Sequence, residues 1–324
     1  MAVRERRGAD REARRSAVHR RRRTLALLAA AAFVAGVVTA ATSGGDDRGA
    51  THPRARAAAR PLPELPGGGR RLFPDRRIVA AYGSPRDPQL GTLGVGTLSS
   101  AVARLRRQAR PYARKTRPVL PALELLTVIA TAAPGPENLH RERQPVSQIA
   151  RHLRVARANH ALLILDIQPG RADFPTEARV LERWLREPDV GLALDPEWRV
   201  GPDQIPGQVI GSTTAAEINS VSQWLAGIVQ RGRLPQKLLL VHQFTDAMIS
   251  GKAQVVRRPG LAIVFNVDGF GGAAIKRAKY DQFAAQAGPG FRNGFKLFYQ
   301  EDTGLMTPRE VLALRPPPDV IVYE

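Results

Sequence analysis

The sequence predicts an α/β fold, a (β/α)8 TIM barrel that lacks its last helix. Eight short runs rich in aliphatic and β-branched residues lie between residue 77 and the C-terminus. Amphipathic stretches separate these runs, which is the pattern of parallel-sheet proteins. Together they occupy roughly 250 residues, the usual size of such a barrel. Because the runs are almost continuously apolar, we expect helices to cover the sheet and bury both of its faces.

The elements follow from these patterns in chain order. The predicted strands are 77–83, 123–131, 161–168, 190–195, 237–244, 261–268, 295–300 and 319–323. Helices with apolar residues at three- and four-residue spacing are predicted at 99–114, 146–159, 176–186, 215–231, 273–287 and 308–314. The runner-up fold, a doubly wound open sheet, normally has a glycine fingerprint after its first strand, and AYGSPRDPQLGTLGVG does not fit one.

Local signals refine these elements. Thr214 with Glu217, and Thr307 with Glu310, have the spacing of capping boxes. The connection 245–260 is poorly helical. The chain ends on the eighth strand, so the region before residue 77 is expected to cover the gap left by the missing helix.

Three segments precede the barrel domain at 77–324. Residues 1–23 form a basic tail with ten Arg, and residues 24–42 contain no charge. Nineteen helical residues span about 28 Å, close to the thickness of the bilayer's hydrocarbon core. Residues 43–76 are rich in Gly, Pro and Arg without an apolar period, which predicts a disordered linker.

The charge around residues 24–42 predicts the orientation of the chain. Arginines are more frequent before this stretch than after it, so the N-terminus is expected to stay in the cytoplasm. The stretch predicts a single-pass membrane anchor with the barrel outside the cytoplasm. The alternative is a cleaved signal peptide, with small residues near Ala40 at the cleavage site and a secreted barrel.

Composition excludes several classes of protein. The 324 residues include no Cys, which excludes disulfide scaffolds, zinc fingers and thiol nucleophiles. The net charge of +20 is concentrated before residue 118, and residues 118–324 are nearly neutral. We therefore expect no nucleic-acid partner.

Active sites of (β/α)8 barrels lie at the C-terminal ends of the strands, so polar residues there are the candidates for function. Carboxylates and aromatic rings recur at these ends and predict a sugar-binding crater. The candidate substrate-binding residues are Tyr82, Asp166, Gln168, Asp195, Trp198, His242, Gln243, Asn266, Asp268 and Tyr299. Phe270 adds a further aromatic ring, and Glu124 is expected inside the barrel or in its wall.

Glycoside hydrolysis needs one carboxyl group as acid and a second as base or nucleophile. In a large class of barrel glycosidases the two catalytic Glu residues end strands four and seven, and this sequence resembles that class in having Glu197 and Glu301 at those positions. Glu197 and Glu301 are therefore the predicted catalytic pair. The sequence reads Asp-Pro-Glu where that class has Asn-Glu-Pro, so the resemblance is one of architecture and position.

A second resemblance covers most of residues 78–324. The stretches VGLALDPEWRVGPDQIPGQVIGSTTAAEINSVSQWL and LPQKLLLVHQFTDAMI look like a family of exported or membrane-anchored actinobacterial proteins that has no assigned activity. The resemblance implies a shared glycosidase-like crater and a cell-envelope carbohydrate as the partner, without naming the substrate.

Two other functions remain open. Asp166, Asp195, Glu197, Asp268 and His242 can instead hold a divalent cation for cleavage of phosphodiester or amide bonds. The two-carboxylate mechanism needs no cofactor and no metal, so a chelator separates these hypotheses. The third function is a non-catalytic barrel that binds a wall glycan or a protein.

Overall fold

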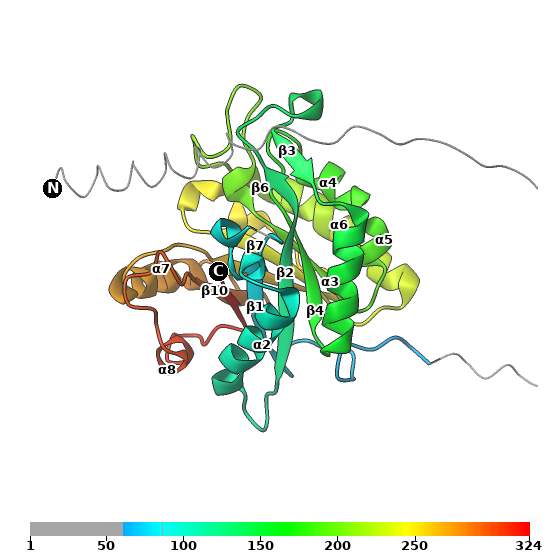
Figure 1. Cartoon of the computed structure of the whole chain (residues 1–324), viewed down its shortest axis with the longest axis vertical. Helices are drawn as coiled ribbons and strands as arrows, with labels where there is room; N and C mark the ends of the chain where they lie inside the picture. Colours follow the sequence, from blue (N-terminus) through cyan, green and yellow to red (C-terminus); the bar gives the residue numbers. More distant parts are fainter. Residues whose placement is uncertain (1–60, 86) are drawn as a thin grey trace, which may run out of the picture.

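The computed structural model describes residues 61–85 and 87–324. Eight parallel strands close into a barrel, because β1 pairs with β11 on one side and with β2 on the other. The barrel strands are β1 (Arg77–Gly83), β2 (Val119–Ala130), β4 (Leu162–Ile167), β5 (Val190–Leu194), β7 (Lys237–Gln243), β9 (Leu261–Val267), β10 (Arg292–Leu297) and β11 (Val320–Tyr323). This is the predicted TIM-barrel fold (Figure 1).

One strand lies elsewhere along the chain than the sequence predicted. β10 runs over Arg292–Leu297, where 295–300 was expected. Its polar start, Arg-Asn-Gly, does not look like a strand, but Gly294 pairs with Asn266 of β9 and Val320 of β11. A Cβ at Gly294 would lie 2.4 Å from the Asn266 side-chain oxygen, so the glycine allows the two strands to approach. The strand ends at Leu297.

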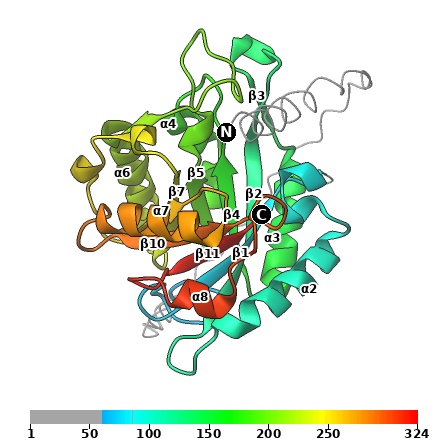
Figure 2. The ribbon, with the colours of Figure 1, turned by 90° about the vertical axis from the view of Figure 1, so that its left-hand side faces the viewer.

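The helices surround the strands, and Figure 2 shows them on the outside of the barrel. They are α2 (Leu98–Ala109), α3 (Val146–Ala158), α4 (Phe174–Val180), α5 (Glu182–Leu185), α6 (Ala215–Gly232), α7 (Ala273–Ala285) and α8 (Pro308–Leu312). The predicted helix 176–186 is divided into α4 and α5. β11 is the last element along the described residues.

One of the two predicted capping boxes is present. At α8, Thr307 and Glu310 each accept a hydrogen bond from the other's backbone N–H. At α6, Thr214 caps the N–H of Glu217, but the Glu217 carboxylate accepts hydrogen bonds from Thr213 and from the backbone of Phe174. The second capping box was therefore a wrong prediction, because a tertiary contact captures the glutamate.

The loops at the C-terminal ends of the strands carry the remaining structure. Residues 245–260 form 3₁₀ turns and β8 (Ile249–Ser250), which pairs with β6 (Thr213–Thr214). This confirms that the connection is poorly helical. β3 (Arg141–Arg143) pairs antiparallel with the far end of β2 and lengthens the barrel wall there.

The end of the barrel opposite β3 is closed by residues that precede β1. Leu65, Leu72 and Phe73 are buried with the inward-facing side chains of the strands. The backbone N–H groups of Leu72 and Phe73 donate to the Gln236 side chain at 2.8 and 3.2 Å. Residues 61–76, blue in Figure 1, belonged to the predicted linker, so the folded part of the chain begins earlier than residue 77.

The predicted membrane-spanning segment 24–42, the basic tail 1–23 and residues 43–60 of the linker lie outside the described residues. Within 61–85 and 87–324, no helix is both long enough and apolar enough to cross a membrane.

Candidate active site at the barrel mouth

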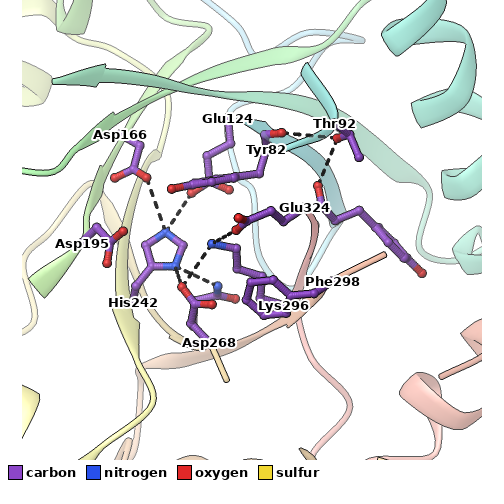
Figure 3. Close-up of polar contacts among 12 residues, drawn as sticks. Tyr82, Thr92, Glu124, Asp166, Asp195, His242, Asp268, Lys296, Phe298 and Glu324 are labelled. Carbon is purple, nitrogen blue, oxygen red and sulfur yellow. Dashed lines mark hydrogen bonds and ion pairs between the residues drawn. The ribbon is translucent and has the colours of Figure 1, made fainter. Parts of the chain in front are cut away.

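The inside of the barrel changes from apolar to charged along the strands. Alternate side chains of each strand point inward, and near the N-terminal ends these are Ile78, Leu120, Leu162, Leu238 and Val320. Near the C-terminal ends, the same alternation places Tyr82, Glu124, Asp166, His242, Asn266 and Lys296 inside, all buried. Figure 3 shows most of these charged residues facing one another. The charged layer therefore lies where barrel enzymes have their active sites.

His242 occupies the middle of this layer and contacts carboxylates through both ring nitrogens. Its Nε2 lies 3.0 Å from Glu124 Oε1 and 4.0 Å from Asp166 Oδ2, and its Nδ1 lies 2.8 Å from Asp268 Oδ2. Burial lowers the pKa of His242, but the hydrogen bonds to Asp268 and Glu124 outweigh it and raise the pKa well above its ordinary value. In this arrangement the ring is an imidazolium that donates two hydrogen bonds.

Lys296 supplies the second buried positive charge. Its Nζ lies 2.8 Å from Glu324 Oε2 and 3.2 Å from Asp268 Oδ2, and it sits 3.7 Å from the centre of the Tyr82 ring. Burial raises the pKa of Asp268, but the charge of Lys296 and the hydrogen bond from His242 outweigh it, so the pKa of Asp268 is lowered. Asp268 is therefore held ionised.

Asp166 and Asp195 are in a different electrostatic state. Both are buried, and burial raises the pKa of each to about 7, against the opposing charge of His242. Both Asp166 carboxyl oxygens, Glu124 Oε2 and Asp195 Oδ1 have no hydrogen-bond partner among the described residues. Buried carboxyl groups without partners are costly, which marks these residues as functional candidates.

Three of these side chains have the geometry of a metal site. Ligand atoms of Glu124, Asp166 and His242 all lie within 4.8 Å of one another. Asp268 on the far nitrogen of His242 would fix the ring, as carboxylates commonly do for metal-bound histidines. These three residues can therefore hold a metal ion, and the expectation that the protein needs none is unconfirmed.

A cavity of about 270 Å³ lies at the barrel mouth, next to this layer. Its lining includes the acidic residues Asp195, Glu197, Asp268 and Glu324, and the basic residue Lys296. Aromatic side chains form much of the rest of its lining: Tyr82, Trp198, Phe244, Phe270 and Phe298. The cavity thus combines acidic side chains with aromatic rings.

Gln168 connects the cavity lining to the barrel wall. Its Nε2 lies 3.2 Å from the Tyr82 hydroxyl and 3.4 Å from Asp195 Oδ2, and its Oε1 accepts from the Ala130 N–H at 3.3 Å. Asp195 directly precedes the 3₁₀ turn Pro196–Trp198. Its side chain makes no cap hydrogen bond to the 3₁₀ turn that follows it.

The predicted site residues separate into three groups. Tyr82, Asp166, Gln168, Asp195, His242, Asn266 and Asp268 form the charged layer and cavity floor, with Glu197 and Trp198 also in the cavity lining. Tyr299 and Glu301 line a neighbouring cavity instead. Gln243 points away from both cavities, and its Oε1 accepts from Lys252 Nζ at 2.7 Å.

The position of Glu301 follows from the shifted β10. That strand ends at Leu297, so Glu301 lies in the turn beyond it rather than at the strand end. Glu197 and Glu301, the predicted catalytic pair, consequently line different cavities. The acidic residue Asp302 in the same turn is structural: it accepts from the N–H groups of Gly271 and Phe298 and pairs with Lys276 at 3.1 Å.

Sequence reasoning missed Lys296, Glu324, Phe244 and Phe298. Lys296 carried a usable signal, since it lies within the predicted strand 295–300 and a lysine within a buried strand is unusual. Glu324 is the last residue described, and nothing in the sequence associates it with Lys296.

Comparisons with known proteins give weak structural matches alone. No family model matches the sequence, and no curated protein sequence is significantly similar to it. Among solved structures, dihydropteroate synthase from Xanthomonas albilineans with 4-aminobenzoic acid matches with a TM-score of 0.31 and 13% identity, over 77% of this chain and 88% of that chain. A second structure of that enzyme, in complex with indole-2-carboxylic acid and 6-chloroguanine, matches with a TM-score of 0.29 and 12% identity over the same shares of the two chains. Matches this weak carry no argument.

Proposed function

We propose that this chain is an exported barrel hydrolase that cleaves glycosidic bonds of a cell-envelope carbohydrate and is held at the cell membrane by residues 24–42. One observation carries the proposal: Asp195 and Asp268 line the same cavity, and aromatic rings line it with them. Two carboxyl groups are the chemical requirement of glycoside hydrolysis. Aromatic rings are the side chains that stack on the apolar faces of sugars.

Asp195 is the proposed general acid. Burial raises its pKa to about 7, so a large fraction of the enzyme holds the proton near neutral pH. In the reaction this proton passes to the glycosidic oxygen while the bond from that oxygen to the anomeric carbon breaks. The leaving sugar departs as an alcohol, and Asp195 is left ionised.

Asp268 is the proposed base or nucleophile. Its ion pairs with Lys296 and His242 favour the ionised carboxylate. As a nucleophile it forms a bond to the anomeric carbon that water later hydrolyses; as a base it takes a proton from the attacking water. The separation of the two carboxyl groups distinguishes these routes, at about 5–5.5 Å for retention and about 6.5–9.5 Å for inversion.

This proposal replaces Glu197 and Glu301 as the reacting pair, because Glu301 lines the neighbouring cavity. Glu197 and Trp198 line the same cavity as Asp195 and are assigned to the binding of sugar hydroxyls and ring faces. Gln168 contacts Asp195 from the side of the barrel wall, and the same Gln168 nitrogen contacts the Tyr82 hydroxyl.

The test is hydrolysis of isolated cell-envelope polysaccharide, measured as release of reducing ends by the full chain. Asp195→Asn and Asp268→Asn should each lower kcat by about a hundredfold or more. The control is Asp203→Asn, which removes an exposed carboxylate outside both cavities. Hydrolysis that persists in both site variants contradicts the assignment. Binding without hydrolysis by the wild-type chain indicates the non-catalytic barrel.

A second candidate function is favoured by the geometry of Glu124, Asp166 and His242, which can hold a divalent cation. A bound cation would act as a Lewis acid in the cleavage of phosphodiester or amide bonds. A chelator separates the candidates. Loss of hydrolysis with EDTA and recovery with added Mg²⁺ or Mn²⁺ supports the metal-dependent enzyme, whereas the two-carboxylate glycosidase is unaffected.

A further inference from the structure

A second, larger cavity adjoins the one at the barrel mouth. It has a volume of about 470 Å³ and is lined by residues of α2, the loop after β1 and the turn after β10. Gln89 and Glu324 line both cavities, so the two are neighbours across these side chains. A ligand that spans both cavities would have to be a chain of linked units.

Tyr299 gives this second cavity a fixed aromatic surface. The ring is 45% exposed and stacks on Tyr323, with centroids 5.4 Å apart and planes 25° apart. Its hydroxyl donates to Gln108 Oε1 at 3.1 Å, and its backbone N–H donates to the Glu324 carbonyl at 3.0 Å. One face of Tyr299 is thus packed against a buried ring, and the side chain needs no further ordering before it binds a ligand.

The same cavity carries two arginines from α2. Arg104 is held by hydrogen bonds to the carbonyl groups of Thr92 and Val95, each at 2.8 Å. Arg107 is exposed and makes no hydrogen bond or ion pair with residues 61–85 or 87–324. Of the acids that line the cavity, Glu324 is paired with Lys296. Arg107 is consequently available to an anionic group on a ligand.

We propose that the Tyr299 cavity is a second sugar subsite, which takes a unit bearing a carboxylate or phosphate group on Arg107 while Tyr299 stacks on the sugar ring. This inference rests on the proposed function, because it treats the two cavities as one continuous binding groove. It assigns the substrate to the anionic glycans, with at least two linked sugar units. Glu301 also lines this cavity.

The test measures binding of the full chain to an array of oligosaccharides of two to six units that carry carboxylate groups, phosphate groups or no charge. Anionic members should bind about tenfold more tightly than neutral ones of the same length, since they gain a charge-assisted hydrogen bond to Arg107. The carboxylate and phosphate members show which group Arg107 receives.

Variants identify the subsite within the groove. Arg107→Gln should remove the preference for anionic members, and Tyr299→Ala should weaken binding about tenfold while Tyr299→Phe retains it. Arg106→Gln is the matched control, because Arg106 is exposed on the same helix but does not line the cavity. Equal binding of neutral and anionic members, no binding by any member, or equal effects of Arg107→Gln and Arg106→Gln each overturn the subsite.

Binding and hydrolysis separate this inference from the proposed function. Asp195→Asn lies outside the Tyr299 cavity, so it should abolish hydrolysis and leave the preference for anionic members intact. An anionic preference that depends on Arg107 in a chain without hydrolytic activity refutes the enzyme and retains the subsite. Hydrolysis of neutral glycans without that preference refutes the subsite and retains the enzyme.

Discussion

The Nε2 atom of His242 lies 3.0 Å from Oε1 of Glu124, a contact that joins β7 to β2 across the inside of the barrel. Both side chains are fully buried, and the other ring nitrogen of His242 contacts Asp268. The cluster therefore stabilises a charged histidine between two carboxylates, and removal of one partner leaves a buried charge without compensation.

Glu124→Gln should lower the free energy of unfolding at pH 7 by about 3 kcal/mol or more, because it removes a charge partner of the buried His242. Urea denaturation measures this loss. The control is Glu187→Gln, which breaks a pair with Arg157 in which both side chains are more than 40% exposed, with an expected change of about 0–1 kcal/mol. Similar losses in the two variants contradict a charged His242.

Asp195 should make stability depend on pH between about 4 and about 7. Its pKa is about 7 in the folded chain and about 3.9 in an unfolded one. Between these values the folded state holds a proton that the unfolded state has released, so this contribution to stability is fully present below about pH 4 and is lost as the pH rises through about 7.

Denaturation of the wild-type chain and of Asp195→Asn across pH 4–8 isolates that contribution. The difference between their free energies of unfolding should change in the stated direction and then level off above about pH 7. A difference that is constant with pH indicates that Asp195 is ionised throughout. If Asp195 is the general acid, hydrolysis should also decline above about pH 7.

Gly294→Ala should disturb the site, although Gly294 itself has no role in the proposed reaction. The added Cβ would lie 2.4 Å from Asn266 Oδ1, and the Asn266 side chain contacts His242. Overpacking of this kind costs about 1–3 kcal/mol, measurable by thermal unfolding. Gly272→Ala is the control, because the nearest atom to its Cβ is 3.9 Å away. An unchanged Gly294→Ala variant contradicts close packing of β9 and β10.

Leu72→Ala should destabilise the chain by about 2–5 kcal/mol, because Leu72 is fully buried under the barrel. Leu62→Ala removes a leucine that is 41% exposed in the same segment and should change stability by no more than about 0.5 kcal/mol. Denaturant unfolding of the full chain measures both. If neither variant is destabilised, residues 61–76 do not close the barrel in solution.

Most of the fold was predictable because its signals are local. Each buried parallel strand is a run of apolar residues several positions long, and β1 has the bounds that its sequence predicted. The misplaced strand, β10, begins with residues that favour turns, and only its neighbours β9 and β11 make Asn293 and Gly294 part of a strand. The capping box at Glu217 was wrong for a related reason, since a distant segment competes for that carboxylate.

The site was predictable in outline and not in its pairings. The barrel rule directed attention to strand ends, and seven of the predicted residues, Asp195 and Asp268 among them, do come together there. Glu301 and Tyr299 lie beyond the end of β10, because that strand ends earlier than predicted. Gln243 follows His242 and lies on the opposite face of its strand. Glu124 was expected inside the barrel or in its wall, but its role beside His242 depends on strand closure.

Periodicity and composition along the chain are sufficient to predict the number of strands, their parallel arrangement and the end of the barrel at which acidic residues lie. Each of these properties depends on residues that are neighbours in the sequence. The partners of His242 and Lys296, the pKa values of Asp195 and Asp268, and the division of the crater into two cavities depend on distances between residues far apart in the chain. Burial and charge proximity set those properties, and both exist only after the strands close.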